Sequence, residues 1–579
     1  HNYQGHKQYH YLKNSYLDVE PSNLTRNSNN FFSDSSPFTG GEFNLSSSAS
    51  ALGSGATSVQ FNGATITAPD KDYLGTSRPN PSGSTPDMGA VESPFSKKTT
   101  RFYVSNSGSN GNSGEVGSPL LTIQYALDNA ASGDTVIIND GTYTENVYLG
   151  RAIDLTLASL FFLDGDRAHI ESTAVDGDGS GAVIRLNGNG VIKLSGFKLT
   201  DGDNDGAEYG GGLHATDVTS LSLDNMIVDG NYTSIQDQVA GGISISESEN
   251  VSITNTTISN NIADRYSGLA ITNSETVELV NTLVHSNNSP DTYHSVFLHE
   301  LDELKIVNST VANNTVEVHH NSGGVLINMS SALDSALGMN SIISQNKYLD
   351  EEGEELTTGE NFQLQFQTGK LVMINNYTDA ELVEGNNKIK RSSGNVFSGK
   401  DPFVDVSNDN YALSNFTSAI GAGKNSISYN GGTVTSPDKD RLGALRPNPS
   451  GTSGDIGAIE NSLGQRLNTT YTVKKDGTGN YLTIQGGVNG ILEGDTLMVH
   501  PGNYNENVMI TKAITLESSG GPEVTYIDAD GLAGTVLKLN NFSTADYYGY
   551  PEIHSDITVD GFTIQNGSAI SSEHTSGGV

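Results

Sequence analysis

The sequence contains no cysteine and no tryptophan, and 67 acidic residues outnumber 30 basic ones, which gives a formal charge of −37. The lack of cysteine excludes disulfide scaffolds, thiolate zinc sites and cysteine nucleophiles. The scarcity of Lys and Arg excludes a protein that binds nucleic acid through a basic surface. No apolar run reaches the roughly 18 residues that a membrane-spanning helix needs. We therefore expect neither a nucleic-acid partner nor a membrane span.

Glycine is abundant, with 66 residues, and the chain is internally repetitive. The segment DKDYLGTSRPNPSGSTPDMGAVE at 70–92 returns as DKDRLGALRPNPSGTSGDIGAIE at 438–460, and residues 121–147 return in degenerate form at 482–508. Repeats of this size indicate consecutive structural units. The predicted organisation is the C-terminal part of one unit (1–93), a linker (94–102), a complete unit (103–460), a second linker (461–470) and the N-terminal part of a third unit (471–579).

A finer repeat lies inside the complete unit, where Asn-x-x-apolar-x-x-Asn recurs five times with 26 to 32 residues between the first asparagines. Short alternating strands at this period are typical of a parallel β-helix with one coil per repeat. A turn asparagine can hydrogen-bond to its equivalent on the next coil. We interpret both asparagine columns as structural ladders: Asn225, Asn255, Asn281, Asn308 and Asn340, and Asn231, Asn261, Asn287, Asn314 and Asn346.

The ends of a unit also have signatures. Apolar residues at helical spacing precede the first strand of the complete unit and of the third unit, which predicts a short capping helix over each first coil: Ile123, Ala126, Leu127 and Ala130, and Ile484, Val488 and Ile491. We expect residues 438–460 to cap the far end of the coils. Arg446 with Asp455, and Arg78 with Asp87, are the ion pairs expected inside the two caps.

These motifs resemble a known family. YVSNSGSNGNSG, SPLLTIQYALDNA, GDTVIINDGTYTENV and the asparagine coils are similar to right-handed parallel β-helix proteins of the pectin-lyase-like superfamily. More narrowly, they resemble large secreted and surface repeat proteins of marine Bacteroidota with a choice-of-anchor Q-type tail. The resemblance implies an all-β fold of tandem right-handed parallel β-helices. The opening of the third unit is similar to pectin methylesterases, but its chain stretch holds none of that family's catalytic positions.

A catalytic site is disfavoured by the residue types on one outward row. Strands that follow the glycine pairs place five residue pairs there: His214/Thr216, Ser244/Ser246, Ala270/Thr272, Phe297/His299 and Leu326/Asn328. This row offers no carboxylate, Lys or Arg, whereas lyases need a base and hydrolases need two or three carboxylates. The remaining acid–base or metal candidates are His294, His299, Glu300, Glu317, His319 and His320, which we interpret as solvated loop residues; no catalytic residue is assigned.

Two binding sites are predicted. Tyr293, Phe297 and His299 could stack on the face of a sugar. Asp201, Asp203 and Asp205 have the spacing of a calcium loop, which Glu208 could close, although Gly212 stands where an EF-hand has its bidentate Glu. A solvated acidic turn is the alternative for these aspartates.

The function predicted from these features is adhesive or structural. The chain is expected to be a segment of a large secreted or cell-surface tandem β-helix protein that contacts glycans or other surface components, with further β-helix units of the same long chain as neighbours. Calcium is the one cofactor considered. The alternative is a polysaccharide-active enzyme of the superfamily, a lyase or a carbohydrate esterase.

Overall fold

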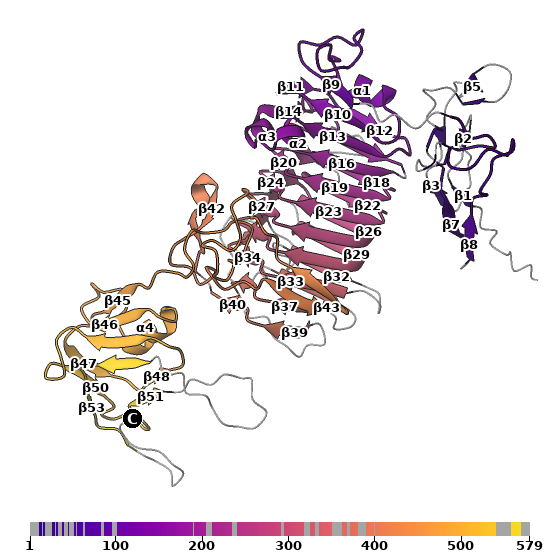
Figure 1. Cartoon of the computed structure of the whole chain (residues 1–579). Coiled ribbons are helices and arrows are strands. Elements are labelled where there is room, and N and C mark those ends of the chain that lie inside the picture. The colour runs from indigo at the N-terminus through magenta and orange to yellow at the C-terminus, as the bar shows by residue number, and fades with distance from the viewer. Residues whose placement is uncertain are drawn as a thin grey trace, which may run out of the picture. The chain divides into compact units, whose positions relative to one another are not determined.

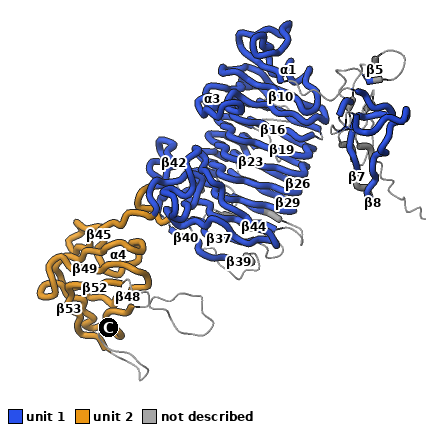
Figure 2. Tube along the Cα trace, viewed as in Figure 1, with its two compact units in different colours: residues 1–413, 419–464 blue, residues 414–418, 465–579 orange. Residues whose placement is uncertain are grey.

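The computed structural model forms two compact units, residues 1–413 with 419–464 and residues 414–418 with 465–579 (Figure 2). The residues that it describes are 11–13, 16–17, 26–28, 31–32, 38–39, 44–45, 51–53, 55–61, 64–80, 82, 86–94, 101–188, 190–203, 211–233, 240–290, 294–317, 325–329, 335–349, 362–366, 371–379, 389–398, 400–539 and 557–568.

The coil body of the first unit, residues 101–397, consists of parallel strands that pair from one coil to the next (Figure 1). Its largest sheet has two columns of strands, which β26 (Tyr266–Val280) and β29 (His294–Val307) span together. The first column also contains β9 (Arg101–Val104), β10 (Asp134–Ile138), β13 (Leu155–Ser159), β16 (Val191–Ser195), β19 (Ser220–Asp224), β23 (Asn250–Thr254), β33 (Ser335–Met339), β37 (Leu371–Ile374) and β39 (Ile389–Ser393). The second contains β12 (Val147–Leu149), β15 (Ile184–Asn187), β18 (Leu213–Thr216), β22 (Ile243–Ser246), β32 (Val325–Met329) and β36 (Phe362–Phe366).

Two further parallel sheets complete the coils. The second sheet has ten strands: β11 (Gly141–Thr144), β14 (Thr173–Asp176), β17 (Lys198–Thr200), β20 (Ile227–Asp229), β24 (Thr257–Ser259), β27 (Leu283–His285), β30 (Thr310–Ala312), β34 (Ile342–Ser344), β38 (Tyr377–Thr378) and β40 (Val396–Phe397). The third has β21 (Tyr232–Thr233), β25 (Ile262–Ala263), β28 (Asn288–Ser289), β31 (Thr315–Glu317) and β35 (Lys347–Leu349). This arrangement confirms the predicted parallel β-helix.

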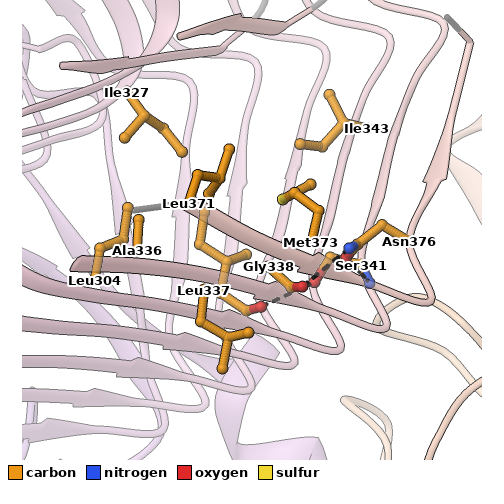
Figure 3. A pocket seen from close by; sticks show the side chains of 11 residues that line it. Leu304, Ile327, Ala336, Leu337, Gly338, Ser341, Ile343, Leu371, Met373 and Asn376 are labelled. Carbon is orange, nitrogen blue, oxygen red and sulfur yellow. Dashed lines mark hydrogen bonds between the residues drawn. The ribbon is translucent and has the colours of Figure 1, made fainter. Parts of the chain in front are cut away.

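The core lies inside the coils because alternate residues of each strand point inward. Leu221, Val251, Val277 and Leu304 are in register on successive coils and almost fully buried. The stack of large side chains is interrupted where Ala336 follows Leu304. Small side chains there leave a void (Figure 3), lined by Leu304, Ile306, Ile327, Ala336, Leu337, Gly338, Ser341, Ile343, Leu371, Met373 and Asn376.

A short helix covers the first coil, as predicted. In α1 (Ile123–Asn129) Ile123, Ala126 and Leu127 are buried, and the N-cap hydroxyl of Thr122 accepts a hydrogen bond from a backbone N–H of the first turn. Glu145, two residues before β12, accepts hydrogen bonds from the first two helical N–H groups at 2.8 and 3.0 Å. An anionic side chain at this end of a helix is favourable. An insertion, α2 (Phe161–Asp164) and α3 (Ala168–Ser172), follows β13.

Residues 403–460, which we name the clamp, lie along the side of the coils rather than over their far end, so the expected end cap is wrong. The clamp contains β41 (Phe403–Asp405), η1 (Val406–Asn408), β42 (Asn410–Leu413), β43 (Ser426–Tyr429) and β44 (Gly432–Thr435). Its apolar residues form one cluster with the outward side of the second sheet and another with the outward side of the largest sheet. The clamp therefore buries apolar side chains that face away from the coil interior.

The clamp's internal ion pair also differs from the expectation. Arg446 Nη1 lies 3.2 Å from Glu460 and donates its hydrogen bond to the backbone oxygen of Asp455. The Asp455 carboxylate instead accepts backbone N–H groups of Gly421 and Asn461. A carboxylate that orders two chain segments needs no cation, because each N–H satisfies one oxygen.

The earlier copy of the clamp, within residues 38–93, repeats this network, with Arg78 3.2 Å from Glu92. It contains the antiparallel pairs β5 (Phe38–Thr39) with β6 (Asn44–Leu45) and β7 (Ser58–Phe61) with β8 (Ala64–Thr67). Two parallel pairs precede it: β1 (Tyr11–Lys13) with β3 (Arg26–Ser28), and β2 (Tyr16–Leu17) with β4 (Phe31–Phe32). Two copies of one sequence thus adopt one local structure.

The second unit begins a further β-helix. Its parallel strands are β45 (Thr470–Val473), β46 (Thr496–Val499), β47 (Gly502–Asn505), β48 (Val508–Ile510), β49 (Thr515–Ser518), β50 (Thr525–Asp528), β51 (Leu537–Leu539), β52 (Thr558–Asp560) and β53 (Thr563–Gln565). The helix α4 (Ile484–Gly490) repeats α1, with Thr483 as N-cap and Glu506 bound to its first N–H groups. The prediction of β-helices that each open with a short helix is confirmed. No helix of the described ranges is long and apolar enough to span a bilayer.

Candidate functional site

The candidate site is the outward row of the second strand column. Strand register places its members on successive coils, from β12 to β36: Tyr148, Arg185, His214, Ser244, Ala270, Phe297, Leu326 and Gln363. Neighbouring coils in such a sheet lie about 4.8 Å apart, so the row is continuous. Within it His214, Ser244, Ala270 and Phe297 are buried, whereas Tyr148 is exposed and Arg185 is half-buried.

An aromatic cluster occupies the middle of this row. The rings of Tyr266 and Phe297 stack with centroids 4.1 Å apart, and the His299 ring stacks on Phe297 at 5.3 Å. The His294 ring lies parallel to Phe297 at 6.4 Å. Phe297 and Tyr266 are only 6% and 4% exposed. Both rings are thus packed within the protein.

This packing limits how the predicted sugar-binding residues can act. Because Phe297 is almost fully buried, it cannot offer an open ring face, and its role here is to hold its neighbours. His299 is half-buried, with a buried Nδ1 that makes no hydrogen bond within the described residues. Tyr293 lies outside them. A sugar contact by His299 and Tyr293 stays a prediction.

Arg185 is a member of the row that sequence reasoning missed. It lies one coil before His214, and its guanidinium carbon is 5.1 Å from the centre of the Tyr148 ring. Burial, assisted by the positive charge of Arg185, lowers the pKa of His214 to about 4. His214 is therefore neutral at physiological pH. The five coils aligned by their glycine pairs hold no Lys or Arg, as expected, but the row extends one coil further, to Arg185, which precedes the first glycine pair.

The remaining acid–base candidates do not converge on one point. His294, His299 and Glu300 lie on β29, whereas Glu317 ends β31 in the third sheet, 3.4 Å from the side-chain amide of Asn288. His319 and His320 lie outside the described residues. Over the described ranges, no group of three or more His, Asp or Glu side chains has the arrangement of a metal site.

The predicted calcium loop is described only in part. Asp201 is exposed and adopts a left-handed backbone conformation with φ of 56°. Asp203 is half-buried, and its backbone forms an isolated antiparallel β-bridge with Gly181. Asp205 and Glu208 lie outside the described residues. The two described aspartates occupy a turn, which suits either a solvated acidic turn or a partial calcium loop.

The second asparagine column forms a continuous buried ladder. The side-chain amides of Asn231, Asn261, Asn287 and Asn314 each donate to the amide oxygen of the next asparagine at 2.9 Å, and Asn346 ends the series. Each of these oxygens also accepts the backbone N–H of the preceding asparagine at 3.0 or 3.1 Å. The column uses these amides inside the fold, which leaves them no ligand role.

The first asparagine column forms the corners of the coils. Asn225, Asn255, Asn281, Asn308 and Asn340 all have φ between 46° and 53°, a left-handed conformation that favours Asn or Gly. Where the clamp passes, the corner side chains bind it: Asn281 donates to the backbone oxygen of Lys439 at 2.8 Å, and Asn340 donates to that of Lys424 at 2.7 Å. The corner residues therefore hold the clamp to the coils.

Comparison with known proteins gives only low-scoring likenesses to solved structures. No protein-family model and no curated protein matches it. Among solved structures it is similar to the pectate lyase Pel9A, with 13% identity, a TM-score of 0.37 and coverage of 63% of this chain and 97% of the lyase. It is also similar to XylC in complex with xylose (12%, 0.28, 62% and 98%) and to pectin methylesterase from Aspergillus niger (12%, 0.28, 55% and 91%). Likenesses at this level assign no activity to this chain, which is a parallel β-helix protein by its own strand pairing.

Proposed function

We propose that the chain is a stiff structural or adhesive segment of a secreted or surface-displayed protein, which contacts glycans or other surface components. The supporting observation is the outward row, where the described side chains from β12 to β29 include no carboxylate and Phe297 is buried. Polysaccharide hydrolases of most families need two carboxylates at the scissile bond. A coil body braced by an asparagine ladder and a clamp suits mechanical presentation.

The resemblance to repeat proteins of marine Bacteroidota with a choice-of-anchor Q-type tail supports the same proposal, with further β-helix units as neighbours in the assembled protein. The high negative charge supports it as well, because like-charged surfaces resist association with one another.

A glycan array probed with the full chain tests the adhesive role. We expect binding to a subset of glycans, and a loss of that binding in Tyr293→Ala and His299→Ala. His500→Ala, a half-buried histidine of the second unit, is the matched control. If the chain binds no glycan on the array, the adhesive role is refuted and the chain is a spacer.

Calcium belongs to this proposal as a stiffening ligand of residues 201–208. We expect calcium to raise the unfolding midpoint relative to magnesium, and Asp201→Asn with Asp203→Asn to remove the difference. An unchanged midpoint after chelation would refute calcium binding.

One observation favours the second candidate, a polysaccharide lyase. Arg185 supplies a cation on the outward row, next to Tyr148 and a neutral His214. Lyases abstract a proton next to a uronate carboxylate, which needs a base and a cationic partner for the carboxylate. Unsaturated products released from polygalacturonate by the full chain, and abolished in Arg185→Ala, would establish this activity over the adhesive role.

A further inference from the structure

The clamp and its earlier copy share one backbone structure. Residues 51–92 align with residues 419–460 without a gap. Their hairpins, β7 with β8 and β43 with β44, pair in the same register. The backbone N–H of Met88 donates to the backbone oxygen of Ala51 at 2.9 Å, and the equivalent bond in the clamp is 3.0 Å long. The surface of one copy can therefore be compared with that of the other, residue by residue.

The clamp binds the coils mainly through its own backbone. Four corner asparagines of the coils donate to backbone oxygens of the clamp. The backbone N–H of Gly457 donates to the backbone oxygen of Asn340 at 2.7 Å. That of Ala458 donates to the Thr310 hydroxyl at 3.0 Å. A second copy of the clamp supplies the same backbone groups whatever its side chains are.

The backbone groups that bind the coils are covered in the clamp and open in the earlier copy. Gly457 and Ala458 are buried, whereas their equivalents Gly89 and Ala90 are exposed. A Cβ at position 457 would lie 2.7 Å from a coil side chain, and a Cβ at position 89 would meet no atom within 4 Å. The earlier copy thus presents the coil-binding backbone without coils on it.

Two large side chains of this surface are exposed in the earlier copy as well. Ile66 is 52% exposed, whereas its equivalent Val434 packs on the apolar cluster at the largest sheet. Tyr73 is 84% exposed, whereas its equivalent Arg441 is half-buried and donates to the Thr257 hydroxyl of the coils. Apolar side chains gathered on an exposed surface are typical of an interaction site.

We propose that the earlier clamp copy docks on the corner side of another coil body with asparagine corners, which belongs to a further β-helix unit of the same protein. The coils at 101–397 are not the partner, because their corner asparagines already bind the clamp. At the proposed interface the N–H groups of Gly89 and Ala90 donate to the partner coils, and Tyr73 stands where the clamp has Arg441. The interface rests on the proposed function only for the expectation of further units.

An exchange variant of the full chain tests the docking surface, with the chain's own coils as the probe. In this variant residues 51–92 replace residues 419–460. The readout is hydrogen exchange by mass spectrometry in peptides that run past position 460 into Asn461, which distinguishes the graft from the native copy. We expect the graft to be protected at 457 and 458 at least about tenfold more than the native copy at 89 and 90, because docked amides donate to the coils.

Two glycine substitutions in the exchange variant are matched. Gly457→Ala should remove the protection, because its Cβ would collide with the coils. Gly443→Ala, at a glycine that also has positive φ but no atom within 4 Å of a Cβ, should leave the protection unchanged. Protection of the graft that is no greater than that of the native copy overturns the proposal, and so does protection that both substitutions leave unchanged.

A graft that fails to fold does not end the test. If circular dichroism shows that the exchange variant is unfolded, Arg441→Tyr and Val434→Ile in the wild-type clamp decide. Retained protection at 457 and 458 supports the proposal, and lost protection in either variant overturns it, because the side chains of the earlier copy would then not fit the coils.

Sedimentation equilibrium of the wild type decides the source of the partner coils. A monomer supports a further unit, whereas a dimer with protected amides at 89 and 90 would assign the surface to a second copy of this chain and overturn the proposal. A docked graft together with a glycan array that shows no binding would refute the adhesive role and leave this interface standing.

Discussion

Removal of one rung from the buried asparagine ladder should destabilise the coil body strongly. Asn287 is fully buried, and its amide donates to the backbone oxygens of Ile258 and His285 and to Asn314. Its own oxygen accepts both the backbone N–H and the side-chain amide of Asn261. Asn287→Ala deletes all of these hydrogen bonds at once and offers water no access to replace them.

The magnitude follows from the groups that lose their partner. The backbone N–H of Asn261 and the backbone oxygen of Ile258 each lose the bond to Asn287, whereas Asn314 keeps the backbone N–H of Asn287. A buried polar group without a partner costs about 1–3 kcal/mol, so two such groups cost about 2–6 kcal/mol. This loss is a large part of the roughly 5–15 kcal/mol that stabilises an ordinary domain.

Urea unfolding followed by far-ultraviolet circular dichroism measures the effect, because the chain has no tryptophan to report it. Asn250→Ala is the matched control: Asn250 is exposed and makes one side-chain hydrogen bond at 3.3 Å to Thr219. We expect less than about 1 kcal/mol for the control. If Asn287→Ala and Asn250→Ala have the same free energy of unfolding, the ladder fixes the alignment of the coils but adds no net stability.

Three other perturbations test the clamp and the core. Burial lowers the pKa of His285 to about 4, so the folded protein favours the neutral form of this histidine. The resulting stability, up to about 3 kcal/mol, is fully present above about pH 6.5 and is lost as the pH falls toward 4. His285→Gln should flatten the pH dependence of the unfolding free energy in this range, and an unchanged slope would refute the prediction. Gly457→Ala should lower the free energy of unfolding in urea by about 1–3 kcal/mol more than Gly89→Ala. Both glycines have positive φ, but only a Cβ at position 457 would meet the coils, 2.7 Å from Ile342. Equal losses would exclude that contact. Ala336→Val should fill the void and raise the free energy of unfolding by about 1 kcal/mol. Ala312→Val, at a packed site, should lower it. A loss of stability in both variants would mean that the void is too small for the larger side chain.

The coil repeat was predictable because each of its signals is local. The corner residue must adopt a left-handed conformation, which restricts it to Asn or Gly, and the inward residues alternate along each strand. Both constraints recur once per coil, so they are visible as a period. A third column, which includes Thr256, Thr282, Ser309 and Ser341, also bonds from coil to coil, but hydroxyl residues are too common for its period to stand out.

The course of the clamp was not predictable because its contacts join residues far apart in the sequence. Asn340 and Lys424 are 84 residues apart, and Asn281 and Lys439 are 158 apart. Nothing in a segment rich in Asp, Pro and Gly indicates which surface its apolar residues cover. The same holds for the contact of the Arg441 side chain with the Thr257 hydroxyl, which lies 184 residues away in the sequence.

The clamp explains why the corners differ along the chain. A corner needs positive φ, and glycine meets that need at Gly196, Gly394 and Gly561, with φ of 77°, 65° and 79°. Asparagine is strained there by comparison, yet it occupies the four corners that bond to the clamp: Asn281, Asn308, Asn340 and Asn375. Only asparagine supplies an amide that reaches a carbonyl of the clamp. Asparagine also forms the corners at Asn225 and Asn255, whose amides donate to Asp224 instead. An asparagine corner therefore serves the clamp where the clamp passes, but does not by itself mark such a contact.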